Sequence, residues 1–542
     1  MSGLAVTIDG VSCAARPGMS LFDCAETAGV LVPTSCMKQG KCRECLVEVQ
    51  EGAEHLSGLA PQEEHLAGRF RLSCRARIET DGGTIRCHTL RRGTLRIETE
   101  AEGLAAGSPL DPAVTRAGRQ VLLDGEPLAE SDGPLHGVAV DVGTTTVALR
   151  LYDLESGALV ATQAFENPQR FGGSEVMARI RYDSEHPGRL LQRTLMGYLS
   201  RAILALPCDP ASIFEIVVAG NTTMRDLFFG LDVAPIGQMP YRSVTEAAFR
   251  EGQSSGTSLS ARAARLRLPV HPDARVYGLP LIGSHVGADA AACLLATGLA
   301  EGDEITALVD IGTNTEVVVG NRERILAASC PAGPAFEGGG VTCGMPALDG
   351  AVERVRIHDD GTVETEVIGG GEAAGICGSG LVDLLGELLR TGRMNAQGRF
   401  SDGETRFPLG DGGGIFFSES DINELAQAKG ANVAGLRIVV EQLGVPLERL
   451  ARIDLAGGFA RHLDLGAARR IGLLADLPDG RIVQVGNAAL EGASIALRSL
   501  SRRRALEAIV QRIEPVRLET DPRFFDLFVD GCQFAPFGSA GS

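Results

Sequence analysis

Tryptophan is absent from this chain of 542 residues, and Phe, Trp and Tyr together make up only 4% of it. A basic excess is lacking too, because the formal net charge is −18 at pH 7. Nucleic-acid phosphates are bound by clustered Lys and Arg, so this charge excludes a general nucleic-acid-binding protein. No apolar run reaches the roughly 18 residues that a membrane span requires. We therefore expect neither a nucleic-acid nor a membrane partner.

A secretory signal is also lacking, since residues 1–9 hold no basic segment followed by an apolar one. The 13 cysteines are odd in number and crowd toward the N-terminus, which does not suit a disulfide framework. We therefore expect a cytoplasmic protein. Glycine, in contrast, is abundant at 69 residues, as in proteins with many tight turns and close backbone approaches to a ligand. The length predicts several domains.

Cysteine spacing near the N-terminus is the strongest chemical signal. Five residues separate Cys36 from Cys42, two separate Cys42 from Cys45, and 28 separate Cys45 from Cys74. Plant-type [2Fe–2S] ferredoxins have a similar run of three cysteines and a distant fourth, with a first gap of about four residues. Zinc is the alternative, but four-cysteine zinc sites usually present two C-x2-C pairs, and Cys74 has no cysteine nearby. The spacing predicts a [2Fe–2S] cluster bound by these four cysteines.

The elements expected around the cysteines are those of a small β-grasp ferredoxin. Residues 4–8 and 11–15 predict a hairpin around an Asp-Gly turn. Residues 21–28 predict a helix that begins after a serine N-cap. Further strands are expected at residues 46–49 and 71–78, with the fourth cysteine inside the second of them.

We assign residues 1–93 to this ferredoxin-type domain. Residues 94–135 mix Gly, Pro, Ala and acidic residues and are predicted to be a linker, with one helix-like piece at Asp111–Ala117. The linker separates the cysteine-rich domain from a longer segment of different amino-acid composition.

Two similar motifs stand about 170 residues apart, Asp141–Thr146 and Asp310–Thr315. In each, a buried apolar strand ends in an aspartate, a Gly-Thr turn follows, and a second strand begins. Backbone amides and hydroxyls of such a turn can bind phosphates, and the aspartate can hold a hydrated divalent cation. We expect Asp141 and Asp310 to be catalytic, in a duplicated fold whose two turns face each other across a cleft. The nucleotide-binding candidates in the turns are Gly143, Thr144, Thr145, Thr146, Gly312, Thr313, Asn314 and Thr315.

Two glycine motifs in the second half complete the expected nucleotide site. Gly378 and Ser379 lie in a turn that leads into an amphipathic helix, and Gly457 and Gly458 follow a strand. A flat base and ribose could lie against the backbone of the double glycine. These motifs, in this order, resemble the superfamily of acetate and sugar kinases, heat-shock chaperones and actin.

That resemblance implies two ribonuclease-H-like lobes of α/β architecture that close around ATP and Mg²⁺. The first lobe would be a middle domain at residues 136–300, and the second a C-terminal ATP-binding domain at residues 301–542. Together with the α+β ferredoxin domain this makes a multidomain protein.

The combination of a [2Fe–2S] ferredoxin, a linker and an actin-like ATPase resembles the reductive activators of corrinoid enzymes. The motifs that carry this resemblance are Asn167–Gly173, Val218–Met224, Ser329–Gly339 and Thr520–Phe524. One departure is Glu175, where the family pattern has Asp.

The resemblance implies an ATP-dependent enzyme that passes one electron from the cluster to a corrinoid protein of a methyltransferase system, converting cob(II)amide to cob(I)amide. It also implies an upstream ferredoxin, flavodoxin or reductase and a homodimer.

Three alternatives stay open at this point. A small-molecule kinase with an appended redox sensor would need a substrate pocket and a catalytic base. An ATP-dependent redox sensor would bind a regulator with negligible electron flux to cobalt. Activators of 2-hydroxyacyl-CoA dehydratases share the ATPase design but carry a [4Fe–4S] cluster that bridges two subunits, which four clustered N-terminal cysteines argue against.

Two further features are expected to be structural. His285 and Asp289 could place an imidazole and a carboxylate by the cleft, but a His before a helix is more often a hydrogen-bonded structural residue. The arginines at positions 498 and 502–504 are expected to form a solvated basic face.

Overall fold

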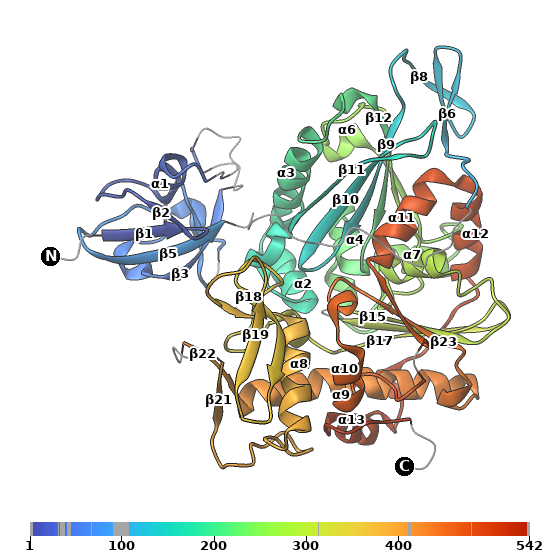
Figure 1. The fold of residues 1–542 in the computed structure, drawn as a ribbon. Helices are drawn as coiled ribbons and strands as arrows, with labels where there is room; N and C mark the ends of the chain where they lie inside the picture. Colours follow the sequence, from blue (N-terminus) through green and yellow to red (C-terminus); the bar gives the residue numbers. More distant parts are fainter. Residues whose placement is uncertain are drawn as a thin grey trace.

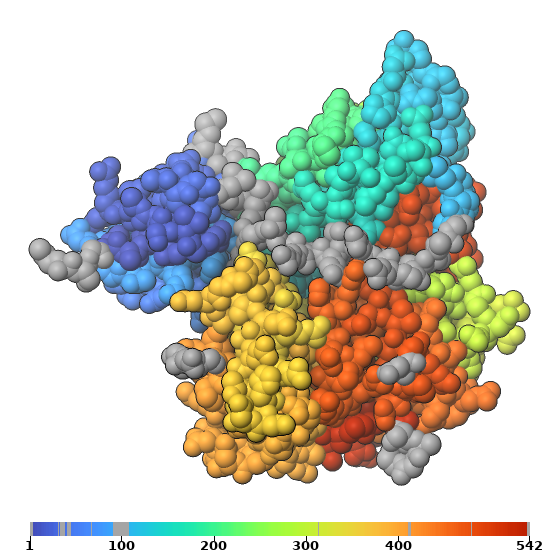
Figure 2. All heavy atoms as spheres, viewed as in Figure 1, coloured from blue at the N-terminus to red at the C-terminus, as the bar shows by residue number. Residues whose placement is uncertain are grey.

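The computed structural model contains an N-terminal domain and two larger lobes (Figure 1). In the space-filling view the N-terminal domain, in blue, abuts the yellow segment of the second lobe (Figure 2). The residues that the structure describes are 4–30, 32, 38–40, 45–66, 68–89, 108–312, 314–409, 414–478 and 480–538.

The N-terminal domain has a five-stranded sheet in the order β2-β1-β5-β3-β4. The expected hairpin is confirmed, because β1 pairs antiparallel with β2 around Asp9 and Gly10, both at positive φ. Helix α1 is confirmed as well, with Ser20 as its N-cap in a capping box with Asp23. Strand β5, which was not predicted, lies parallel to β1 and antiparallel to β3 at the centre of the sheet. The bounds are β1 Leu4–Ile8, β2 Val11–Cys13, α1 Leu21–Thr27, β3 Leu46–Glu51, β4 Phe70–Leu72 and β5 Gly83–Thr89.

The strand expected at residues 71–78 is wrong beyond its first residues. Strand β4 ends at Leu72, whose carbonyl accepts hydrogen bonds from the backbone N–H groups of Arg75 (2.7 Å) and Ala76 (2.9 Å). These bonds close a turn in place of a strand. Cys74 therefore lies in a turn, beside Cys45 at the start of β3.

The segment predicted as a linker contains a folded unit. Its residues 94–107 lie outside the described part, but a three-stranded antiparallel meander follows, with β6 at Val114–Ala117, β7 at Gln120–Leu123 and β8 at Glu126–Glu130. The helix expected at Asp111–Ala117 is wrong. Asp124 and Gly125 both have positive φ and form the tight turn between β7 and β8.

The first lobe is a six-stranded sheet in the order β11-β10-β9-β12-β14-β13. Strand β10 lies antiparallel to β9, and β12 lies parallel to β9 on its other side. The strands are β9 His136–Val142, β10 Thr146–Asp153, β11 Leu159–Glu166, β12 Ile213–Ala219, β13 Leu259–Arg262 and β14 Arg275–Gly278. The helices are α2 Val176–Glu185, α3 Leu190–Leu204, α4 Thr222–Phe229, α5 Val244–Arg250, α6 Ala263–Leu266 and α7 Ala288–Thr297.

The second lobe repeats this core with the sheet order β24-β23-β15-β16-β17-β25. Strand β16 lies antiparallel to β15, and β23 lies parallel to it, as β10 and β12 do about β9. The predicted duplication is therefore confirmed. The strands of this sheet are β15 Thr306–Ile311, β16 Thr315–Gly320, β17 Ile325–Cys330, β23 Arg452–Ala456, β24 Ile482–Gly486 and β25 Glu514–Pro515. The helices are α8 Gly378–Arg390, α9 Glu419–Leu443, α10 Leu465–Arg470 and α13 Phe524–Cys532. Smaller sheets are formed by β18 Ala351–Ile357, β19 Val363–Val367 and β20 Gly375–Ile376, and by β21 Arg406–Leu409 and β22 Ile415–Ser418.

Helices α11 (Ala488–Arg498) and α12 (Leu500–Val510) follow β24 but pack on the first lobe, against α7, β9 and β12. This packing corrects the expected basic face. Arg503 is only 2% exposed and donates two hydrogen bonds to the buried carboxylate of Glu215, at 2.9 and 3.0 Å. Arg498 covers the ring of Tyr152, 4.7 Å from its centroid.

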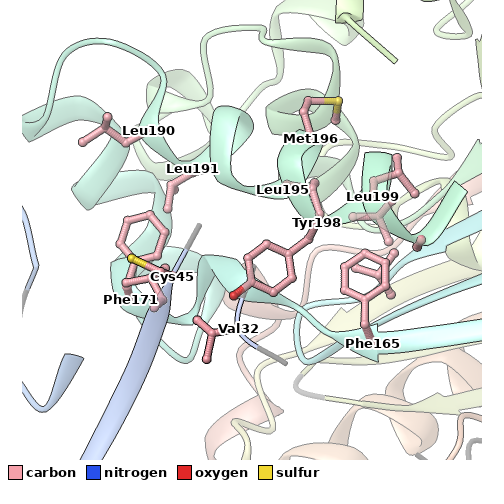
Figure 3. Packing of buried hydrophobic residues seen from close by; sticks show 14 of the residues in the cluster. Val32, Cys45, Phe165, Phe171, Leu190, Leu191, Leu195, Met196, Tyr198 and Leu199 are labelled. Carbon is pink, nitrogen blue, oxygen red and sulfur yellow. The ribbon is translucent and has the colours of Figure 1, made fainter. Parts of the chain in front are cut away.

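The N-terminal domain and the first lobe share one cluster of buried apolar side chains. Figure 3 shows Val32 and Cys45 of the N-terminal domain among Phe171, Leu191 and Tyr198 of the first lobe. Among the helices of the described part, none combines the length and apolar character needed to cross a membrane.

Candidate functional site

A cavity of about 320 Å³ lies between the two lobes and is lined by both Gly-Thr turns. It brings together most of the predicted nucleotide-site residues: Asp141, Gly143, Thr144, Thr145, Thr146, Asp310, Gly312, Asn314, Gly378, Ser379, Gly457 and Gly458. Thr313 lies outside the described residues. Thr315 is buried on β16 and is not among the described residues that line the cavity.

The first turn is held in shape from behind. The side-chain amide of Asn167 donates to the carbonyl of Gly143 at 2.8 Å, and that of Asn221 donates to the hydroxyl of Thr144 at 3.0 Å. The Arg179 guanidinium donates to the carbonyl of Thr144 at 2.6 Å. These three hydrogen bonds hold the turn in one shape at the wall of the cavity, and backbone N–H groups of such a turn can bind an anionic ligand.

The second turn is closed by the backbone N–H of Gly312, which donates to the carbonyl of Asn314 at 3.1 Å. The double glycine packs closely against it, because a Cβ on Gly457 would lie 2.5 Å from the carbonyl oxygen of Ile311. Gly457 also has a φ of 102°, which favours glycine.

Carboxylates gather at the centre of the cavity. Burial, together with the negative charge of Asp310, raises the pKa of Asp141 to about 7, against the hydrogen bond from Asn487 at 3.2 Å. Burial likewise raises the pKa of Asp310 to about 6. The pKa of Asp289 is raised by burial and by Asp310, and that of Glu316 by burial and by Asp289. A divalent cation among these groups would relieve their mutual repulsion.

The arrangement fits Mg²⁺ that keeps most of its water. Within the described ranges, no three His, Cys, Asp or Glu side chains are close enough to hold a metal ion directly. Mg²⁺ dehydrates reluctantly and is often bound through one or two carboxylates and substrate phosphates, which matches this donor set.

The far wall of the cavity suits a flat base. The rings of Phe336 and Phe459 stack with centroids 5.7 Å apart, and Met345 and Ile368 add apolar surface. Helix α8 begins beside them at Gly378, where a Cβ would overlap the backbone carbonyl of Phe336 and the ring of Phe459. The free N–H groups at the start of this helix favour an anionic ligand.

In the N-terminal domain, the Sγ atoms of Cys45 and Cys74 lie 3.3 Å apart. Cys45 is 0% and Cys74 4% exposed. The pKa of Cys45 is raised by Cys74 and by burial, so two thiolates could share this place only with a cation between them. Gly40 has a φ of 71°, and a Cβ there would lie 2.6 Å from the Arg75 side chain. Cys36 and Cys42 lie outside the described residues. The described donors and the glycine-dependent loop fit an iron–sulfur cluster.

Several residues of the cavity were not predicted as functional. Asp289 was not chosen as a site residue, although a carboxylate by the cleft was considered there, and it lines the cavity. Glu316, Glu337, Asn221 and Asn487 line it too. Their positions depend on long-range packing that no local motif records, although Asp289 follows a recognisable Gly-containing turn. His285 is exposed and lies against the ring of Tyr241, outside the cavity.

Three protein-family models match the chain. Residues 6–79 match the 2Fe-2S iron-sulfur cluster binding domain. Residues 136–302 match the RACo middle region, and residues 304–539 match the C-terminal domain of RACo, the ASKHA domain.

Similar proteins of known name cover between 66% and 99% of the chain. The corrinoid activation enzyme RamQ of Eubacterium limosum is 28% identical, with 94% of this chain and 95% of that protein aligned. A reductase of the Co(II) methylated amine-specific corrinoid protein, from Methanosarcina barkeri, is 25% identical, with 66% of this chain and 68% of that protein aligned. A solved structure titled reductive activator for corrinoid, iron-sulfur protein superposes with a TM-score of 0.71 at 28% identity, covering 99% of both chains.

Proposed function

We propose that this chain, which belongs to the family of reductive activators of corrinoid proteins, reduces a partner corrinoid protein at the expense of ATP. Its membership of the family follows from its matches to both RACo regions and to the 2Fe-2S domain. One electron leaves the N-terminal domain and converts cob(II)amide to cob(I)amide in the partner. The observation that carries this proposal is the presence, in one chain, of a buried thiol pair 3.3 Å apart and a cavity between two Gly-Thr turns.

The N-terminal domain would hold a [2Fe–2S] cluster through Cys36, Cys42, Cys45 and Cys74. When bound, this cluster supplies storage for one electron. The protein itself restricts access of water to the two described ligands, which are almost completely buried. The turn after β4 positions Cys74 beside Cys45, and Gly40 leaves room for the Arg75 side chain.

The interlobe cavity would bind ATP with Mg²⁺. The turns at residues 143–146 and 312–315 would bind phosphates, and Asp141 and Asp310 would hold hydrated Mg²⁺ and orient water. Gly378, Ser379, Gly457 and Gly458 would line the nucleoside end. Asn487 orients the carboxylate of Asp141 through its hydrogen bond.

Energetics explain why ATP is needed. Moving one electron uphill costs about 1.4 kcal/mol for each ~59 mV, so a gap of a few hundred mV costs on the order of 5 to 7 kcal/mol. Typical coupling between two binding sites supplies only about 1 to 3 kcal/mol. Binding alone does not close the gap, whereas hydrolysis coupled to release of the reduced partner can.

The partners follow from the same proposal. The corrinoid protein belongs to a methyltransferase system, and the electron donor is a ferredoxin, a flavodoxin or a reductase. We also propose a homodimer in the cytoplasm, on the strength of the family resemblance.

The test is anaerobic incubation of the reduced protein with candidate corrinoid proteins, with and without ATP and Mg²⁺. We expect the cob(II)amide absorbance to disappear with ATP over many turnovers and to persist largely without it. Equal rates with and without ATP would contradict the proposal. Phosphorylation of a sugar in the absence of any corrinoid protein would favour the kinase alternative.

A further inference from the structure

The motif Asn167–Gly173 contributes to the family resemblance but has no part in the proposed function. It forms the 3-10 helix η3 (Pro168–Gly172) at the end of β11. On one side this segment supports the first phosphate turn: the backbone N–H of Asn167 donates to the carbonyl of Thr145 at 2.7 Å, and its side-chain amide donates to Gly143 at 2.8 Å. Any shift of the turn is therefore transmitted to η3.

Arg179 of α2 ties the two together more firmly. Its guanidinium is fully buried and donates to the carbonyl of Thr144 at 2.6 Å and to the carbonyl of Gly173, directly after η3, at 3.0 Å. Burial, and then the charge of Arg170, lowers the pKa of Arg179 to about 9. These contacts make Asn167 and Arg179 positioning residues for the phosphate turn.

The other side of η3 contacts the N-terminal domain. The ring of Phe171 meets His65 edge to face, with centroids 6.1 Å apart, and Tyr182 beside it donates its hydroxyl to the carbonyl of His65 at 2.7 Å. Cys45 lies in the same buried cluster as Phe171 (Figure 3). In this arrangement η3 covers the face of the N-terminal domain that carries a predicted cluster ligand.

Arg170 lies at the junction of three parts of the chain. It forms ion pairs with Glu166 of the first lobe and, at 4.0 Å, with Glu48 of the N-terminal domain. Burial acts to lower its pKa, but the charges of Glu166, Glu48 and Glu337 overcome this and raise it. Glu337 belongs to the second lobe and accepts a hydrogen bond from the hydroxyl of Thr145 at 2.8 Å.

Two cavities meet at this junction. Thr145 and Glu337 line both the nucleotide cavity and a second cavity of about 710 Å³, which also reaches Arg170 and Glu48. A phosphate group at the first turn would place negative charge beside the Glu337 carboxylate and would compete with Glu337 for the Thr145 hydroxyl. It would also attract Arg170, whose positive charge is shared among carboxylates.

We infer that η3 couples the nucleotide cavity to the N-terminal domain. A nucleoside triphosphate bound at the first turn weakens the Arg170–Glu48 contact and releases the N-terminal domain from the first lobe. This inference rests on the proposed nucleotide site. Release uncovers the face that contains Cys45, so a partner protein reaches the electron-storing domain in the nucleotide-bound state. Because linkage is reciprocal, anything that releases the domain must also tighten nucleotide binding.

The test uses the full chain with its cluster assembled, and the variant is the charge reversal Glu48→Lys. Glu48 lies outside the nucleotide cavity. Its matched control is Glu51→Lys on the same strand, whose carboxylate is 55% exposed and faces Arg86 at 3.7 Å. The measured quantity is the dissociation constant of a non-hydrolysable ATP analogue with Mg²⁺. We expect Glu48→Lys to bind it about 3- to 10-fold more tightly, as reversing one partly exposed ion pair allows, and Glu51→Lys to match the wild type.

Hydrogen exchange gives an independent readout. In the wild type, the analogue should accelerate exchange in peptides around His65 and Tyr182, and in Glu48→Lys exchange there should be fast already. Equal nucleotide affinity in Glu48→Lys and wild type, with normal binding in both, would overturn the coupling and leave the proposed function intact. A wild-type protein that binds no nucleotide would overturn both. An unchanged visible spectrum in Glu48→Lys verifies that the N-terminal domain is folded.

Discussion

Replacing Asp310 by Asn should stabilise the nucleotide-free protein while abolishing its ATP-dependent activity. Asp310 lies at the end of β15 among the carboxylates of the cavity, and its pKa is raised from 3.8 to about 6, chiefly by burial. A raised carboxylate pKa means that the folded state disfavours the charge. The folded protein therefore holds this proton over a pH range in which the unfolded chain has lost it.

The sign and size of the effect follow from that pKa. Stability falls as the pH rises from about 4 to about 6 and stays reduced above this range, because the folded state binds more protons there than the unfolded state. One pKa unit corresponds to about 1.4 kcal/mol, so full conversion of the shift gives ~3 kcal/mol. Asp310 is half-buried at the wall of the cavity, and solvent screening reduces the cost to about 1 to 2 kcal/mol. Asparagine carries no charge, so the Asp310→Asn variant avoids this free-energy cost.

The assay is denaturant unfolding of the metal-free and nucleotide-free protein at pH 4 and pH 8. Asp310→Asn should be about 1 to 2 kcal/mol more stable than wild type at pH 8 and close to it at pH 4. Asp526→Asn, at an exposed position on α13, is the control and should show no such pH-dependent gain. A variant that is equally stable or less stable than wild type at pH 8 would refute the reasoning. The same variant should not reduce the cob(II)amide protein with ATP, and reduction at the wild-type rate would remove Asp310 from the site.

Three further predictions test other parts of the molecule. Cys45→Ser should abolish or strongly alter the visible spectrum of the anaerobically purified protein, whereas Cys87→Ser, in the core of the same domain, should leave it unchanged. Arg503→Met should lower the free energy of unfolding by about 3 to 5 kcal/mol, because it leaves the buried charge of Glu215 with one arginine fewer. Urea unfolding measures this free energy, and a loss below about 1 kcal/mol would contradict the prediction. Gly378→Ala should destabilise the fold and weaken ATP binding at least about tenfold, equivalent to ~1.4 kcal/mol, because the new Cβ overlaps the Phe336 backbone carbonyl and forces the start of α8 to move. Calorimetry of ATP binding at a temperature where the variant is still folded measures this, and wild-type affinity would contradict it.

Local chemistry made part of this structure predictable. Asp9 and Gly10 adopt the positive φ values that a tight hairpin needs, and Ser20 caps its helix. The repeated Asp-Gly-Thr turns could be recognised as a pair, because a strand, a tight turn and a second strand are set by neighbouring residues. Each of these features depends on fewer than about ten consecutive residues, the range over which turn and cap signals act.

The errors have equally specific causes. The apolar and polar alternation after Leu72 is typical of a strand, but the Leu72 carbonyl closes a turn and places Cys74 beside Cys45. Pro112 is compatible with the first turn of a helix and made the segment before Ala117 look helical, yet turns at Gly118 and Gly125 pair it into a meander. In the first case hydrogen bonds within the segment itself decided the outcome, and in the second case pairing with the next strand did.

The residues missed at the cavity share one cause, which also explains how the lobes are joined. Asn487 comes directly after β24 of the second lobe and begins α11, which packs on the first lobe. The chain therefore crosses between the lobes at Gly486 and Asn487, and the Asn487 side chain bonds Asp141 at the crossing point. A rotation of one lobe against the other must bend the chain at this crossing, next to the hydrogen bond that orients a carboxylate whose pKa is about 7. No local sequence motif could reveal this placement, because Asn487 and Asp141 lie 346 residues apart in the chain.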